Sequence, residues 1–130
     1  MIVVGVSAPD AKPNDDGATM QDSSSYCMTS QGEVGAPGKA LNNVPDSSVV
    51  QSDEFRRRPR VDQAFRQYDD VLVTLDCGRH TLHFQTPTVD HVIAMQQQHH
   101  RPEQQWVLSV NMKGHFSPPQ SARVQVQLSR

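Results

Sequence analysis

Histidine is the side chain in this sequence best suited to bind a metal ion or to transfer a proton, and its spacing does not favour a metal site. All six histidines lie in the second half of the chain. His80 and His83 are three residues apart, so in a regular strand they would project from opposite faces and could not share an ion. His99 and His100 are neighbours that also diverge at a predicted helix end, where their cationic forms would complement the helix dipole. We therefore predict no metal site and no cofactor.

The two cysteines, Cys27 and Cys77, are too few for a disulfide framework or for the four ligands of a structural zinc site. A site assembled from Cys77, His80 and a distant His or Asp is the metal arrangement that stays open. Two unpaired thiols indicate a reducing compartment. The opening MIVVGV lacks the basic residues and the length of a secretory signal. No segment approaches the roughly 18 apolar residues of a membrane helix. We expect a soluble cytoplasmic protein, or one incorporated in a particle, with no membrane partner.

Catalytic motifs do not appear in the sequence. No Gly-x-Ser-x-Gly nucleophile elbow is present, and GEVGAPGK at 32–39 lacks the Gly-Lys-Ser/Thr ending of a phosphate-binding loop. Asp69 and Asp70 are adjacent carboxylates, which most simply end a helix before a strand. We predict a non-enzyme with no catalytic residues and no small-molecule substrate.

The densest run of charge, RRRPR, is the first candidate for partner binding. Guanidinium groups bind phosphate or carboxylate through paired hydrogen bonds, so this run could hold nucleic acid or an acidic protein segment, including one from a second copy. It could also be a solvated linker. The arginines concerned are Arg56, Arg57, Arg58 and Arg60.

Trp106 is the second candidate for partner binding. It is the single tryptophan of the chain and follows Gln104 and Gln105 in a segment that could be an edge strand. A tryptophan is most often a large core residue, but at an edge it would be a strong contact for a partner.

Composition divides the chain near residue 55. Hydrophobic residues make up 35% and the mean hydropathy is -0.61, which is low for a globular domain. Residues 1–55 carry two lysines against eight acidic side chains, a net charge of -6, and the total of -2 leaves +4 for residues 56–130. The first half is rich in Pro, Gly, Ser, Asn and Asp. We predict a flexible acidic arm over 1–55 and a small folded domain over 56–130.

Periodicity in the second half predicts alternating helices and strands. An i, i+3, i+4, i+7 pattern predicts a helix over 59–68, and Thr86 or Thr88 would cap a second helix of about ten to thirteen residues. A β-hairpin is expected over 71–76 and 79–85, turning at Cys77-Gly78 with a positive φ at Gly78. Alternating residues predict strands over 105–112 and 122–130. The fold class is therefore α+β: a mainly antiparallel sheet of about four strands with one or two short helices.

The predicted domain of about 76 residues would hold only a small core, with sheet edges left open. A domain of this size is stabilised when it associates with another protein chain. We therefore predict a non-enzymatic assembly or protein–protein interaction module that binds a protein partner or a second copy through its arm and an open sheet edge. It would be a small subunit of a larger complex, such as a viral or phage particle or a bacterial machine. The alternative is a nucleic-acid-binding accessory protein that uses the arginine run.

Overall fold

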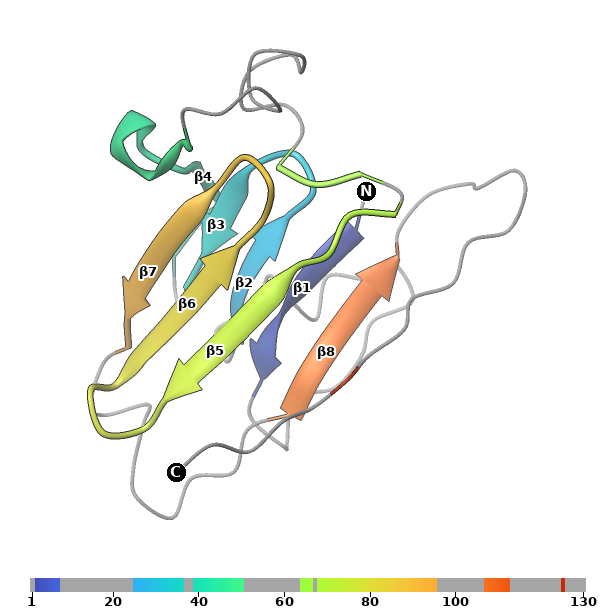
Figure 1. Cartoon of the computed structure of the whole chain (residues 1–130). Coiled ribbons are helices and arrows are strands. Elements are labelled where there is room, and N and C mark those ends of the chain that lie inside the picture. The colour runs from blue at the N-terminus through green and yellow to red at the C-terminus, as the bar shows by residue number, and fades with distance from the viewer. Residues whose placement is uncertain are drawn as a thin grey trace.

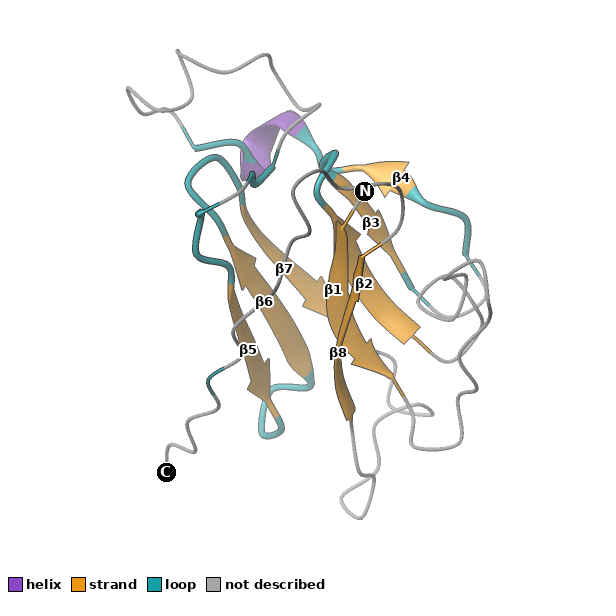
Figure 2. Ribbon diagram, turned by 90° about the vertical axis from the view of Figure 1, so that its right-hand side faces the viewer, coloured by secondary structure: helices purple, strands orange, loops and turns teal. Residues whose placement is uncertain are grey.

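Two antiparallel β-sheets face each other and enclose the core of the molecule (Figures 1 and 2). The structure, a computed structural model, describes residues 2–7, 25–36, 39–50, 64–66, 68–95, 107–112 and 125. These residues contain no α-helix; their one helical element is the short 3-10 helix η2 (Asp46–Ser48). None of their helices is long and apolar enough to cross a membrane.

The larger sheet combines four strands from the beginning of the chain with a fifth that starts more than 60 residues further on. Its order is β4-β3-β2-β1-β8. The strands are β1 (Ile2–Ser7), β2 (Ser25–Thr29), β3 (Glu33–Gly35), β4 (Asn42–Asn43) and β8 (Val107–Met112). The central strand β1 pairs with β2 on one side and with β8 on the other.

The smaller sheet is a meander with the order β5-β6-β7. Its strands are β5 (Leu72–Asp76), β6 (Thr81–Gln85) and β7 (Asp90–Ala94). Val49 in the segment after η2 forms an isolated antiparallel bridge with Val89, and the Val50 amide donates to the Thr88 carbonyl at 2.9 Å. The N-terminal apolar patch is therefore a strand of the larger sheet, and the patch around Val49 joins the smaller sheet through a single bridge.

The core forms where the inward rows of the two sheets meet. Leu82 and Phe84 on β6 are fully buried and pack in one cluster with residues of the larger sheet. Burying a side chain of this size stabilises the fold by about 1.5–3 kcal/mol. The buried members contributed by β1 and β2 are Val4, Val6, Tyr26 and Met28.

Part of the second face of the larger sheet, at β1 and β2, is buried as well. Val3 and Cys27 form a separate small cluster on that face, with the partly buried Leu41 against them. All five residues of β2 are buried, so this strand shows no alternation of apolar and polar residues. The sequence signal for a strand is therefore weak at β2, where burial is greatest.

A glycine lets β1 and β2 approach closely. A Cβ atom placed on Gly5 would lie 2.0 Å from the Tyr26 carbonyl oxygen and 2.8 Å from the Cys27 Cα. Both are backbone atoms in the paired strand, so neither can move without disturbing the ladder. Gly5 is the residue that this register requires.

The segment before β5 closes one end of the sandwich. Ala64 and Phe65 are buried in the core. The Ala64 amide donates to the Ser30 carbonyl at 2.8 Å, and the Ala64 carbonyl accepts a 2.9 Å hydrogen bond from the Thr88 hydroxyl. Ala64 is thus held between turns of the two sheets.

The structure corrects the predicted α+β class and the predicted arm. The expectation of a mainly antiparallel sheet is confirmed, but the residues form two sheets in place of one sheet with helices. The long disordered arm is wrong, because β1 to β4 come from residues 2–43 and build most of the larger sheet. Their apolar residues are few but lie in the core. The predicted boundary near residue 55 lies outside the described residues.

Both predicted helices are wrong over the residues described. In the first, Ala64 and Phe65 are buried but Tyr68 is 94% exposed and has a φ of 69°, so no continuous apolar stripe exists. The second is strand β7, in which Val92 faces outward and Ile93 packs against the core. The Thr86 hydroxyl, expected as a helix cap, accepts the Thr88 and Val89 amides at 3.2 and 3.0 Å in the β6–β7 turn.

The predicted hairpin and the predicted strand over 105–112 are confirmed as β5–β6 and β8. The turn differs in one detail, because the positive φ of 55° belongs to His80 and not to Gly78. The Asp76 carboxylate accepts the Arg79 amide at 3.0 Å, which stabilises this turn. The strand predicted over 122–130 lies outside the described residues, apart from Gln125.

Candidate functional site

The histidines of the smaller sheet bind neighbouring side chains, each on a different face. His83 projects from the outer face of β6, where its Nε2 lies 2.5 Å from the Asp90 carboxylate of β7. His80 lies in the turn before β6. Among the residues described, no group of three or more His, Cys, Asp or Glu side chains is placed to hold a metal ion.

His91 links the smaller sheet to the 3-10 helix. It lies on β7 directly opposite Phe84, and its Nδ1 is 2.7 Å from the Ser48 hydroxyl of η2. Burial lowers the pKa of His91 from its usual 6.5, and the neighbouring His83 lowers it further. The neutral imidazole is therefore the form that suits this position.

The two thiols differ in environment. Cys27 is buried on β2, where removal from water raises its pKa to about 11, while Cys77 is exposed in the β5–β6 turn. The thiolate is the reactive form of cysteine. Burial therefore disfavours the reactive form of Cys27, which packs with Val3 and Leu41.

One candidate interaction surface is the edge at β8, which we call the β8 edge and define by Leu108 and Val110. These residues lie opposite Val6 and Val4 in the ladder, so they project from the core-facing side of the larger sheet. Val6 and Val4 are buried, whereas Leu108 and Val110 are 39% and 36% exposed. Figure 1 shows β8 to one side of β5, the nearest strand of the facing sheet. The core-facing side chains are therefore buried at β1 but partly open to water at β8.

A second candidate surface is the outer face of the smaller sheet. It is formed by the outward residues of the three strands. Leu72 is 57% exposed and Val92 is 52% exposed, and His83 lies opposite both Thr74 and Val92 in the ladder. We call this surface the outer face; its residues are Leu72, Thr74, Asp76, Thr81, His83, Gln85, Asp90, Val92 and Ala94.

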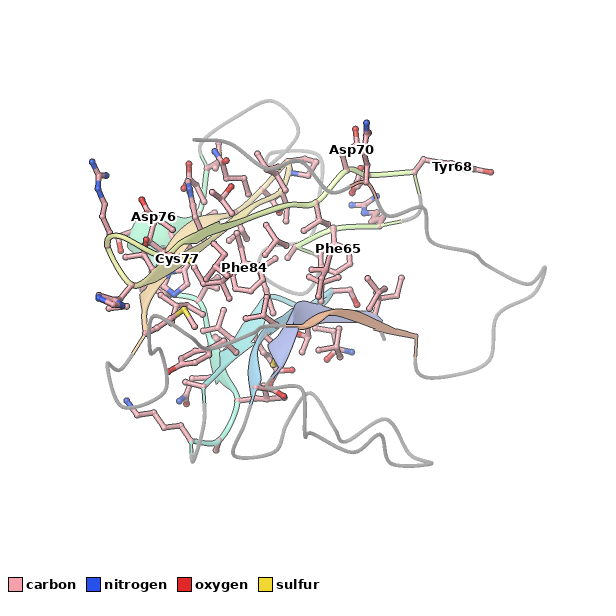
Figure 3. All side chains as sticks on the ribbon, turned by 90° about the horizontal axis from the view of Figure 1, so that it is seen from below. Phe65, Tyr68, Asp70, Asp76, Cys77 and Phe84 are labelled. Carbon is pink, nitrogen blue, oxygen red and sulfur yellow. The ribbon has the colours of Figure 1, made fainter. Side chains whose placement is uncertain are left out.

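Tyr68 stands beside the outer face because of the turn that precedes β5. The Arg66 amide donates to the Asp69 carboxylate at 2.7 Å, and the Asp69 amide donates to the Arg66 carbonyl at 3.1 Å. Tyr68 lies within this turn in the left-handed region, which costs a non-glycine residue roughly 1 kcal/mol or more. Figure 3 shows Tyr68 and Asp70 pointing away from the body of the molecule, while Phe65 and Phe84 lie between the sheets.

The site residues predicted from the sequence lie outside the described residues. These are Arg56, Arg57, Arg58, Arg60 and Trp106. Among the described residues, β8, which begins at the residue after Trp106, is the last strand of the larger sheet.

Sequence reasoning missed the outer face and Tyr68. The sequence placed Val71, Val73 and Leu75 on the core side of the first hairpin strand, and these residues do pack against the core. Leu72 was left on the opposite side without a role, and Val92 and Tyr68 were assigned to the apolar stripes of two helices. The available signal was alternation: in DHVIA, Asp90, Val92 and Ala94 share one side, and His91 and Ile93 share the other. Comparison with known proteins adds no assignment, since no family model, curated protein or solved structure matches the chain.

Proposed function

We propose that this chain is a non-enzymatic assembly module that pairs with a second copy of itself through the β8 edge. The observation that carries the proposal is the exposure of Leu108 and Val110 on a strand at the edge of the larger sheet. The argument from an undersized core no longer applies, because both halves of the chain contribute to the core. The argument from open sheet edges remains.

β8 lacks the features that prevent an exposed edge strand from pairing with a strand of another chain. Its sequence, VLSVNM, has no charge and no proline over six residues. Soluble proteins commonly protect exposed edges with lysine, proline or a bulge, because unpaired backbone groups otherwise bind another strand. Among the described residues, β8 pairs with β1 alone. Strand addition would give its other side backbone hydrogen bonds.

The sequence of β8 is compatible with pairing to itself. A two-fold axis through Ser109 would align two antiparallel β8 strands so that Leu108 of each copy lies opposite Val110 of the other. Both apolar pairs would then lie on the core-facing side, next to the buried Val4 and Val6. Cross-strand pairs of this kind contribute roughly 0.2–1 kcal/mol each. No like charges would meet.

Sedimentation velocity over a wide range of protein concentration tests the proposal. The wild-type chain should show a concentration-dependent monomer–dimer equilibrium, and its melting temperature should rise with concentration. The double variant Leu108→Lys, Val110→Lys should stay monomeric, because paired lysines would repel across the two-fold axis. A wild-type chain that is monomeric at every concentration would overturn the proposal.

A matched variant separates the β8 edge from other apolar surfaces. Leu72→Lys, Val92→Lys makes the same chemical change at two residues that are at least as exposed, on the outer face of the other sheet. It should dimerise like the wild type. Equal loss of dimer in both double variants would indicate a general effect of charge and would count against β8 pairing.

A further inference from the structure

We infer that the outer face, together with Tyr68 and Asp70, is a docking surface for a basic segment of another protein that also carries aliphatic side chains. This inference stands on residues of the smaller sheet and of the segment before it. It is independent of the β8 edge.

The apolar part of the contact comes from three exposed side chains. Leu72 and Val92 are more than half exposed on the outer face, and Tyr68 is almost entirely exposed. Tyrosine is a frequent binding hot spot, because it buries a large area at a small cost in side-chain entropy. The turn that holds Tyr68 imposes an unfavourable φ while leaving its ring in water. Two hydrogen bonds between Arg66 and Asp69 hold this turn, so the exposed ring is available to a partner.

The charge on this surface selects the partner. Asp70 and Asp90 are exposed, and Figure 3 shows Asp70 on the same side as Asp76. Asp76 has Arg79 at 3.9 Å as an ion-pair partner, and Asp90 contacts His83. These three carboxylates still outnumber the guanidinium groups when the exposed Arg66 of the turn before β5 is counted beside Arg79. Arginine or lysine on the partner complements it, whereas the phosphates of nucleic acid would be repelled.

The flat, three-stranded arrangement suits an extended segment. Outward residues on neighbouring strands are about 5 Å apart in the direction across the strands. The rows Leu72–Gln85–Asp90 and Thr74–His83–Val92 place apolar, polar and acidic groups within reach of one short peptide. A segment that alternates arginine and leucine can present both kinds of side chain to these rows.

The experiment is a titration of the full isotope-labelled chain with a short synthetic peptide that alternates arginine and leucine, followed by NMR. Shifts should concentrate on the amides of β5 to β7 and of residues 68–70, and the affinity should fall as salt is added. A peptide alternating glutamate and leucine should not bind. Equal affinity for the acidic peptide, or shifts confined to other parts of the molecule, would overturn the inference.

Matched variants identify the contacts. Asp90→Asn and the pair Leu72→Ser, Val92→Ser should each weaken binding of the arginine–leucine peptide by about tenfold. The controls are Asp46→Asn on η2 and the pair Leu108→Ser, Val110→Ser on β8, which should bind as the wild type does. Equal weakening by test and control variants would overturn the inference.

The second copy is the other occupant that this surface could take. Sedimentation velocity of the double variant Leu72→Lys, Val92→Lys distinguishes self-association through the outer face from binding of a basic partner. Dissociation of the dimer in that variant, with an intact dimer in Leu108→Lys, Val110→Lys, would assign the outer face to self-association and overturn the basic-partner inference.

Discussion

Protonation of His91 opposes folding. This histidine sits between β7 and η2 with the Ser48 hydroxyl against its Nδ1, and burial favours its neutral form. The folded chain therefore takes up this proton at a lower pH than the unfolded chain does. The stabilisation is fully present above pH 6.5 and is lost as the pH falls from there toward the lowered pKa of the folded state.

His91→Gln should reduce the pH dependence of stability. Glutamine can still hydrogen-bond to Ser48 but does not titrate, so the free energy of unfolding should decline less between about pH 7.5 and pH 5.5 than in the wild type. Urea denaturation at several pH values measures this difference. Ser48→Ala is the control: it removes the hydrogen bond but leaves His91 buried, so the decline should persist. An unchanged decline in His91→Gln would refute the assignment.

At the level of single residues, the chemical capability of a side chain could be predicted from the sequence, whereas its contacts could not. The hydroxyl of Thr86 was expected to cap backbone amides and does so, in a turn and not at a helix. The contacts His83–Asp90 and His91–Ser48 depend on the register of β6 with β7 and on the position of η2. Both depend on tertiary structure, which cannot be predicted from the spacing of residues along the chain.

At the level of elements, local alternation predicted β5, β6 and β8, because each strand has one side with more apolar residues and a clear turn or loop beside it. β7 was missed because Val89, Val92 and Ile93 satisfy the i, i+3, i+4 pattern of a helix as well as they satisfy a strand. Pairing with β6 decides between the two, and it buries Ile93 while leaving Val92 in water. β2 was missed because it is buried on both faces.

The pairing of β1 with β2 predicts unequal effects of one substitution at two glycines. Gly5→Ala places a methyl group 2.0 Å from a backbone oxygen, so it should destabilise the fold by about 1–3 kcal/mol or more. Gly78→Ala, in the exposed β5–β6 turn, meets only the Asp76 carboxylate at 3.5 Å and should change stability little. Chemical denaturation of both variants gives the comparison. Similar stability of the two would show that β1 and β2 do not pair in this register.

At the level of the whole molecule, the two halves of the chain should unfold together. The compositional boundary near residue 55 suggested an arm and a domain, but β1 lies between β2 and β8, and one core cluster joins Val4 and Tyr26 to Phe84. Composition averages over residues and so does not show that a few valines and a tyrosine occupy the core. Only the path of the chain in space shows this.

Hydrogen exchange provides the test of that joint unfolding. Amides of β1 and β2 should be protected to the same free energy as those of β6, and removal of residues 1–7 should abolish protection in β8 and weaken the core. Exchange of β1 and β2 that is much faster than that of β6, or a truncated chain with unchanged protection in β8, would contradict a single cooperative unit.

The position of β1 also has a consequence for synthesis on the ribosome. This strand emerges early, yet one of its two neighbours, β8, is translated about a hundred residues later. Until then one side of an apolar strand has no partner from the same chain, and contacts so distant in sequence form slowly. Completion of the larger sheet must therefore follow translation of residue 112, and during that interval nascent chains depend on dilution or on chaperones to avoid joining one another.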